Sequence, residues 1–164
     1  MNMKLHLFYY KCKKCGKEFK MPHLPGDRYG DFLMRNKKNE ILYINEFKDN
    51  VFNEVGVFFT KIMNIFLKIN EFNESDVFQT IFSVACDGGT GSDDNSYCIM
   101  RDPTCPYCWQ ENVGCWGATE PPEYIEQDVK LVTHDHWNTF TEQEKYDAVY
   151  QATADYFSKE NGGK

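Results

Sequence analysis

Two short stretches dominate the sequence: residues 5–21, LHLFYYKCKKCGKEFKM, and residues 101–109, RDPTCPYCW. Each holds two cysteines separated by two residues, Cys12 and Cys15 in the first stretch and Cys105 and Cys108 in the second. Cysteines at this spacing lie on a tight turn whose backbone amides point toward both sulfur atoms. The amides offset thiolate charge and aim the sulfurs at one point, so the two turns predict a metal site.

Zinc is the ion that four thiolates bind as a tetrahedron, with Zn–S distances of about 2.3 Å. Residues 4–21 and 97–110 resemble the zinc-ribbon (rubredoxin-like knuckle) superfamily in their paired cysteines, and Pro106 stiffens the second turn. The resemblance implies one structural zinc ion, bound by Cys12, Cys15, Cys105 and Cys108 between the two knuckles. A redox-active pair is the alternative, but thioredoxin-like proteins need one such motif on a βαβ scaffold, and this chain has two.

The spacing between the two knuckles departs from that family. Eighty-nine residues separate Cys15 from Cys105, whereas paired motifs of this kind are usually about 15–20 residues apart. The entropy cost of closing a loop grows only logarithmically with length, so a large insertion is permissible. We therefore expect an α+β fold: a single zinc-stabilised domain over residues 1–164, with a zinc-ribbon-like β core, a helical insertion over about 40–86 and a C-terminal helix over about 142–158.

Local patterns predict the elements of this fold. The clearest is a helix over 50–69, whose apolar residues recur every three or four positions. Its apolar stripe is wide, which indicates burial between two layers, with a protein-binding face as the alternative. A capping box, Thr141 to Glu144, opens the last helix. The other expected elements are strands over 4–11, 17–21, 97–101 and 124–132, a hairpin of 32–35 with 41–44, and a helix over 75–84 capped by Ser75.

Composition fits a folded, water-soluble chain. Hydrophobic residues make up 41% of the 164, including 13 Phe, 10 Tyr and 3 Trp, enough to build a core. No segment has 18 apolar residues without charge, and the N-terminus lacks a signal peptide's apolar region, so we expect a cytoplasmic protein that does not enter membranes. Seven cysteines, an odd number, favour metal binding over a closed set of disulfides. Frequent Asn, Lys, Ile, Phe and Tyr suggest a bacterial or phage source.

Charge is divided unevenly along the chain. The net charge is −7, yet residues 1–40 hold 10 Lys/Arg against 4 Asp/Glu, and the remainder holds 8 against 21. Five lysines cluster around the first knuckle, with aromatic residues between them: Lys11, Lys13, Lys14, Lys17 and Lys20. Such a pattern suits contact with nucleic acid, or with another partner. Alternatively, these lysines are solvated and offset the charge of the thiolates.

His134 and His136 are the most enzyme-like feature. On a strand, residues two apart share a face, so both imidazoles could bind one metal ion. Cys86, Cys98, Cys115 and His23 are further candidates for such a second site. The alternative is that the histidines are solvated or hydrogen-bonded, and that the spare cysteines are ordinary buried thiols.

These features favour a non-enzymatic binding protein. A four-thiolate zinc site leaves no open coordination position for catalysis, and an acidic body attracts basic protein surfaces. We expect a zinc-stabilised protein whose partner is another protein, acting as an inhibitor, immunity protein or adaptor. Binding of nucleic acid through the basic knuckle is the first alternative, and a metallohydrolase that uses His134 and His136 is the second.

Overall fold

Strands and helices alternate in blocks along this α+β chain, which confirms the predicted fold class. The computed structural model describes residues 1–26, 28–66, 72–88 and 95–162. The strands are β1 (Asn2–Cys12), β2 (Glu18–His23), β3 (Asp31–Arg35), β4 (Ile41–Asn45), β5 (Cys98–Ile99), β6 (Val113–Ala118), β7 (Tyr124–Asp128) and β8 (Lys130–Leu131). The helices are α1 (Asn50–Phe66), α2 (Glu74–Ile81), α3 (Asp135–Asn138) and α4 (Glu142–Gly162), with a short 3-10 turn, η1 (Phe82–Ala85), after α2.

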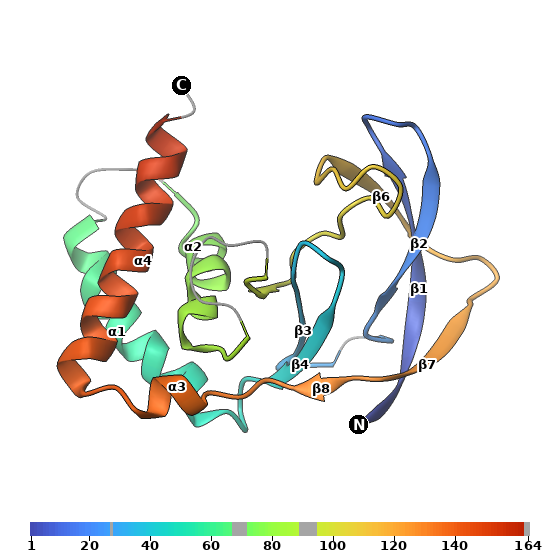
Figure 1. Cartoon of the computed structure of the whole chain (residues 1–164). Helices are drawn as coiled ribbons and strands as arrows, with labels where there is room; N and C mark the ends of the chain where they lie inside the picture. The colour runs from blue at the N-terminus through green and yellow to red at the C-terminus, as the bar shows by residue number, and fades with distance from the viewer. Residues whose placement is uncertain (27, 67–71, 89–94, 163–164) are drawn as a thin grey trace.

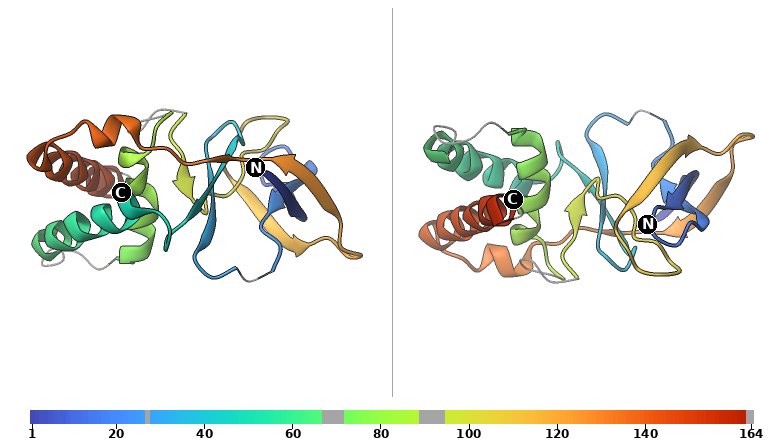
Figure 2. Two further views of the ribbon diagram at one scale, coloured as in Figure 1. Left: turned by 90° about the horizontal axis from the view of Figure 1, so that it is seen from below. Right: turned by 90° about the horizontal axis from the view of Figure 1, so that it is seen from above.

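The elements form three groups along the long direction of the molecule. The helices lie at one end, and a sheet of β1, β2, β6 and β7, here called sheet A, lies at the other (Figures 1 and 2). Between them is sheet B, in the order β5-β3-β4-β8. The chain passes from sheet A through sheet B to the helices, returns to sheet A, and then ends in α3 and α4.

Sheet A is built around β1, the longest strand. On one edge β2 pairs antiparallel with it, Tyr10 opposite Phe19. On the other edge β6 pairs with its second half and β7 with its first half. This arrangement places Cys12 at the end of the central strand, where the turn to β2 begins. Strand β6 was not predicted, because its sequence, VGCWGA, contains two glycines and no alternation.

Sheet B joins the two ends of the molecule. The predicted hairpin is confirmed as β3 and β4, which pair antiparallel. The single strand predicted over 124–132 is wrong, because it is two strands in two sheets: β7 pairs with β1, and β8 runs parallel to β4. The buried residue Val129 stands between them and packs with Met3 and Leu5. One short segment therefore ties sheet A to sheet B.

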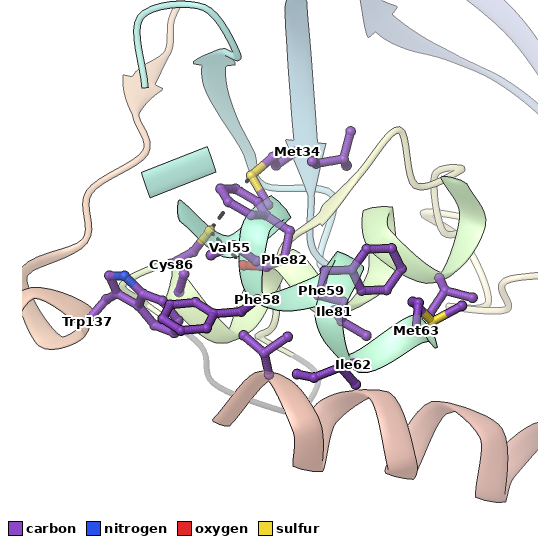
Figure 3. Packing of buried hydrophobic residues seen from close by; sticks show 14 of the residues in the cluster. Met34, Val55, Phe58, Phe59, Ile62, Met63, Ile81, Phe82, Cys86 and Trp137 are labelled. Atoms are coloured by element: carbon purple, nitrogen blue, oxygen red, sulfur yellow. Dashed lines mark hydrogen bonds between the residues drawn. The ribbon is translucent and has the colours of Figure 1, made fainter. Parts of the chain in front are cut away.

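The main hydrophobic core lies among the helices and one face of sheet B (Figure 3). Phe58, Ile62 and Phe66 of α1 lie in the stripe that the sequence predicts, and Phe66 stacks on Phe157 of α4. Burial of α1 against other elements is thus confirmed. The end of the predicted helix, beyond position 66, lies outside the described residues.

The helix ends are set by local hydrogen bonds. The capping box is confirmed: Glu144 N–H donates to Thr141 Oγ1 at 3.2 Å, and Thr141 N–H donates to the Glu144 carboxylate at 2.6 Å. Helix α2 is also confirmed, but its cap is Asn73, whose side chain accepts from the N–H of Ser75. Ser75 was the wrong cap because the helix begins one residue earlier, at Glu74, which places Ser75 inside its first turn.

Candidate metal centre

Four cysteines from opposite ends of the sequence meet beside sheet A. Cys12 and Cys15 come from the turn between β1 and β2, and Cys105 and Cys108 come from the turn between β5 and β6. All four sulfur atoms lie within 4.8 Å of one another. Two of the distances join one turn to the other, 3.5 Å from Cys12 Sγ to Cys108 Sγ and 3.7 Å from Cys15 Sγ to Cys105 Sγ. The prediction that these residues come together is confirmed, and we call them the four-cysteine cluster.

The distances suit ligands of one metal ion. A disulfide would need sulfurs about 2.0 Å apart, and all four cysteines are free thiols. A tetrahedron with metal–sulfur bonds of about 2.3 Å has edges of about 3.8 Å, close to the two distances observed. The cluster could therefore hold a metal ion with little rearrangement.

The backbone has the same conformation in both turns. Gly16 N–H donates to the carbonyl of Cys12 at 3.0 Å, and Trp109 N–H donates to the carbonyl of Cys105 at 2.8 Å. Both of these donors have a positive φ, +74° for Gly16 and +56° for Trp109. Glycine adopts this conformation freely, whereas tryptophan does so at a cost. The two knuckles are thus equivalent in geometry but differ in the residue that closes them.

The electrostatics of the site favour a bound cation. Backbone N–H groups of Cys15 and Lys14 donate to the sulfur of Cys12 and lower the pKa of this thiol to about 6. Burial raises the pKa of Cys108 in the same cluster to about 12. One thiolate is therefore readily formed, but four adjacent thiolates require a positive ion to offset their repulsion.

Two features hold the cluster in place. A small core of Tyr10 and Phe19 packs against Cys12 and Cys105. On the other side, Asn39 at the tip of the β3–β4 hairpin binds the residue before the second knuckle. Its amide donates to the carbonyl of Thr104 at 2.7 Å and accepts from the N–H of Thr104 at 2.8 Å. Sheet B thereby fixes the position of the second turn.

The three other cysteines lie apart from this cluster. Cys86 and Cys98 are buried, and burial raises the pKa of both thiols. Cys115 is exposed on β6. Across the residues that the structure describes, the four-cysteine cluster is the one group of potential ligands within metal-binding distance.

His134 and His136 lie at the start of helix α3, so they do not share the face of a strand as a common metal site was expected to require. His134 contacts the carbonyl of Ala85 at 2.6 Å through Nδ1 and the Asp49 carboxylate at 2.9 Å through Nε2. His136 contacts the Asp87 carboxylate through Nδ1 and the carbonyl of Val84 through Nε2. A helix begins here because the Asp87 carboxylate accepts from the N–H groups of Asp135 and His136 and caps its first turn.

Each of these rings faces two acceptors. In His134 both nitrogens therefore donate and the imidazolium form is favoured. Burial alone would lower the pKa of His134, but its hydrogen bonds to Asp49 and Ala85 outweigh burial and raise it. A nitrogen that donates a proton has no lone pair for a metal ion. The hydrogen bonds of these two histidines thus connect α3 to the rest of the helical end.

The five lysines are all exposed on the β1–β2 hairpin. Three of them lie over aromatic rings: Lys11 over Trp116 at 5.7 Å, Lys17 over Tyr107 at 4.7 Å and Lys20 over Tyr9 at 5.3 Å. Lys20 also forms an ion pair with Glu123 at 2.7 Å. Three of the five lysines therefore accompany aromatic side chains.

Sequence reasoning missed three exposed aromatic residues, two in the second knuckle and one on the strand β6 that follows it. Tyr107, Trp109 and Trp116 expose 55%, 57% and 59% of their surface, and we call them the knuckle surface. Trp109 directly follows Cys108, where Gly16 follows Cys15 in the other knuckle. A comparison of the two motifs would have singled it out.

Comparison with family models, with curated proteins and with solved structures finds no significant match to this chain. Among the described helices, none combines the length and the apolar character needed to cross a bilayer.

Proposed function

We propose that this chain is a non-enzymatic binding protein, stabilised by one structural zinc ion, whose partner is another protein that docks on the knuckle surface. An inhibitor, an immunity protein or an adaptor of bacterial or phage origin would have this character. The observation that carries the proposal is Trp109, a large exposed aromatic side chain held at a positive φ in a turn that glycine would close without strain.

The choice of zinc rests on the donor set. Four thiolates at tetrahedral distances are typical of zinc or iron, and zinc takes this geometry without redox chemistry. Four protein ligands leave no position for water or substrate. The ion would therefore supply folding energy rather than catalysis.

The choice of a protein partner rests on the side chains of the knuckle surface. Trp and Tyr are enriched among the residues that dominate the energy of protein interfaces. Lys11 and Lys17 lie over two of these rings, so the partner surface should offer an apolar pocket with acidic groups at its rim. The face of α1 is a weaker candidate, because Val55, Phe58 and Ile62 are buried against other elements.

Nucleic acid is the second candidate, favoured by the lysines that lie over aromatic rings. Rings of this kind can stack on bases while lysines neutralise phosphates. Two features place it second. Four thiolates around a divalent ion carry a net charge of −2, which offsets part of the five lysines, and Lys20 is already paired with Glu123.

The test is capture of partners from the native cell, followed by binding measurements with the purified partner. The bait variants are Tyr107→Ala with Trp116→Ala, and a control, Val57→Ala with Ile65→Ala, which removes exposed apolar side chains from α1. The proposal expects a captured protein that resists nuclease treatment. Its affinity should fall at least about tenfold, or about 1.4 kcal/mol, in the knuckle variant and remain unchanged in the control.

Equal losses in both variants would reject the knuckle surface. Capture that disappears on nuclease treatment, with salt-dependent oligonucleotide binding that requires Lys11, Lys13, Lys14 and Lys17, would place nucleic acid first. Zinc content, measured on each variant, shows whether the fold of the knuckles is intact.

A further inference from the structure

A cavity of about 570 Å³ lies between sheet A and sheet B. Phe8 and Leu24 line it from the side of sheet A, and Phe32 and Arg35 of β3 line it from sheet B. Arg28 and Arg101 also border it. Its volume is within the range of about 300–1,000 Å³ that is typical of small-molecule sites. The lining combines an apolar wall with three guanidinium groups and the carboxylates of Asp31, Glu46 and Asp102.

Arg35 is the unusual member of this lining. Its side chain is 3% exposed, although arginine is rarely buried without a counter-ion. Nη2 donates to the carbonyl of Pro22 at 2.9 Å. Nη1 is buried and has no hydrogen-bond partner among the described residues. A buried cation of this kind is costly unless an anion compensates it.

Among the described residues, the three carboxylates that line the cavity, those of Asp31, Glu46 and Asp102, form no ion pair with Arg35 within 4.0 Å. The carboxylate of Asp31 already accepts from Tyr43 and Asn45 and pairs with Arg28 at 3.8 Å. Asp102 borders the cavity and attracts Arg35 through space, but within the described part of the chain the two form no ion pair closer than 4.0 Å. His23, which also borders the cavity, is neutral, because burial and then the charge of Arg35 lower its pKa to about 4.

We propose that this cavity binds a small organic anion, whose carboxylate or phosphate group pairs with Arg35 while its apolar body lies against Phe8, Leu24 and Phe32. A guanidinium group binds both kinds of oxyanion through two parallel hydrogen bonds. Three arginines and three carboxylates border the cavity, and Arg35 is the arginine whose Nη1 has no hydrogen-bond partner among the described residues. The lining of the cavity includes no residue of the four-cysteine cluster or of the knuckle surface. The test of this proposal is therefore independent of the test of the proposed function.

The test uses two fluorescent probes that share an aromatic body, anilinonaphthalene sulfonate, which is an anion, and N-phenylnaphthylamine, which is neutral. The zinc-loaded protein should bind the anionic probe with a stoichiometry of one. Arg35→Met keeps a side chain of similar length without charge. It should weaken the anionic probe by at least about tenfold and change the neutral probe by less than about twofold. Trp116→Ala, on the knuckle surface, is the control and should change neither.

A second measurement needs no variant at Arg35, in case Arg35→Met does not fold. Benzoate and inorganic phosphate should each displace the anionic probe from the wild-type protein, whereas neutral benzamide should not. Displacement by benzoate alone would assign the site to carboxylates, and displacement by phosphate alone to phosphates. The proposal is overturned if both probes bind wild type and Arg35→Met alike, or if benzamide displaces the anion as well as benzoate does.

Discussion

At the scale of single residues, the positive φ of Trp109 is energetically unfavourable, whereas the same conformation at Gly16 is not. Left-handed backbone costs a non-glycine residue about 1–2 kcal/mol. The Trp109 side chain is more than half exposed, so its packing within this chain offsets little of that energy. Residues strained in this way persist where they serve a contact, which agrees with the position of Trp109 on the proposed docking surface.

Replacement of Trp109 by glycine should therefore stabilise the zinc-loaded protein. Trp109→Ala removes the same indole but keeps a side chain at φ of +56°, so it serves as the matched control. We expect the free energy of unfolding to be about 1 kcal/mol higher for Trp109→Gly than for Trp109→Ala. Chemical denaturation monitored by circular dichroism measures the difference. Equal stability of the two variants would show that the turn imposes no strain.

His134 should make stability depend on pH. Its pKa lies above the ordinary value of 6.5 in the folded protein, because the hydrogen bonds to Asp49 and Ala85 outweigh burial. The stabilisation is therefore complete below about pH 6.5 and is lost as pH rises through the folded-state pKa. Asp87, which also faces this ring through space, has a lowered pKa and stays ionised in this range. The free energy of unfolding should thus fall between neutral and mildly alkaline pH.

His134→Gln should flatten this pH dependence and lower stability by roughly 1–3 kcal/mol, since the half-buried carboxylate of Asp49 loses a charged partner. Asp49→Asn should flatten it as well, because it removes the charge that favours the imidazolium. Denaturation curves at several pH values compare the three proteins. A wild-type protein whose stability rises with pH over this interval would contradict the assignment.

At the scale of elements, the β3–β4 hairpin positions the second knuckle through Asn39. This residue also has a positive φ, +64°, so glycine fits its backbone and removes only the side chain. Asn39→Gly leaves the buried N–H and carbonyl of Thr104 without partners, which should cost about 1–3 kcal/mol. The loss should fall on the metal site, with faster zinc transfer to a chromogenic chelator. Asn2→Gly, at the exposed start of β1, is the control and should leave that rate unchanged.

The sequence predicts elements best where the signal is local. The three- and four-residue spacing in α1 and the capping box of α4 depend on residues within one helix, and both are confirmed. The cysteine pairs also carry their own turn geometry. The division of 124–131 between β7 and β8 depends on distant partners, β1 and β4, which no local pattern reveals.

The candidate sites follow the same rule. The meeting of the four cysteines was predictable, because paired cysteines at a fixed spacing have few other uses. The burial of Arg35 and the exposure of Trp116 were not, because both depend on how sheet A and sheet B pack. His134 and His136 show the reverse case, in which a local pattern suggested a site and the distant carboxylates of Asp49 and Asp87 gave it another role.

At the scale of the whole molecule, the helical end and the end that contains sheet A differ both in net charge and in the hydrophobic core that they contain. Residues 41–98 and 132–164, which contain the four helices, hold 6 Lys/Arg against 15 Asp/Glu, whereas the remainder holds 12 against 10. The large core among the helices includes none of the four clustered cysteines. The small core around Tyr10 includes Cys12 and Cys105 as buried members. The four-cysteine cluster therefore belongs to the end of the molecule that contains sheet A.

Removal of the metal should loosen that end first. Because structural zinc binding is coupled to folding, a chelator should abolish amide protection in β2, in β6 and in the second half of β1, which ends at Cys12. Helices α1 and α4 should stay protected, since their contacts, such as Phe66 with Phe157, do not involve the cluster. Hydrogen exchange read by mass spectrometry follows both ends at once. The double variant Cys12→Ser with Cys105→Ser should reproduce the effect of the chelator, whereas the control Cys115→Ser should not. Simultaneous loss of protection in α4 and β2 would instead show that the whole chain unfolds as one unit when the metal is removed.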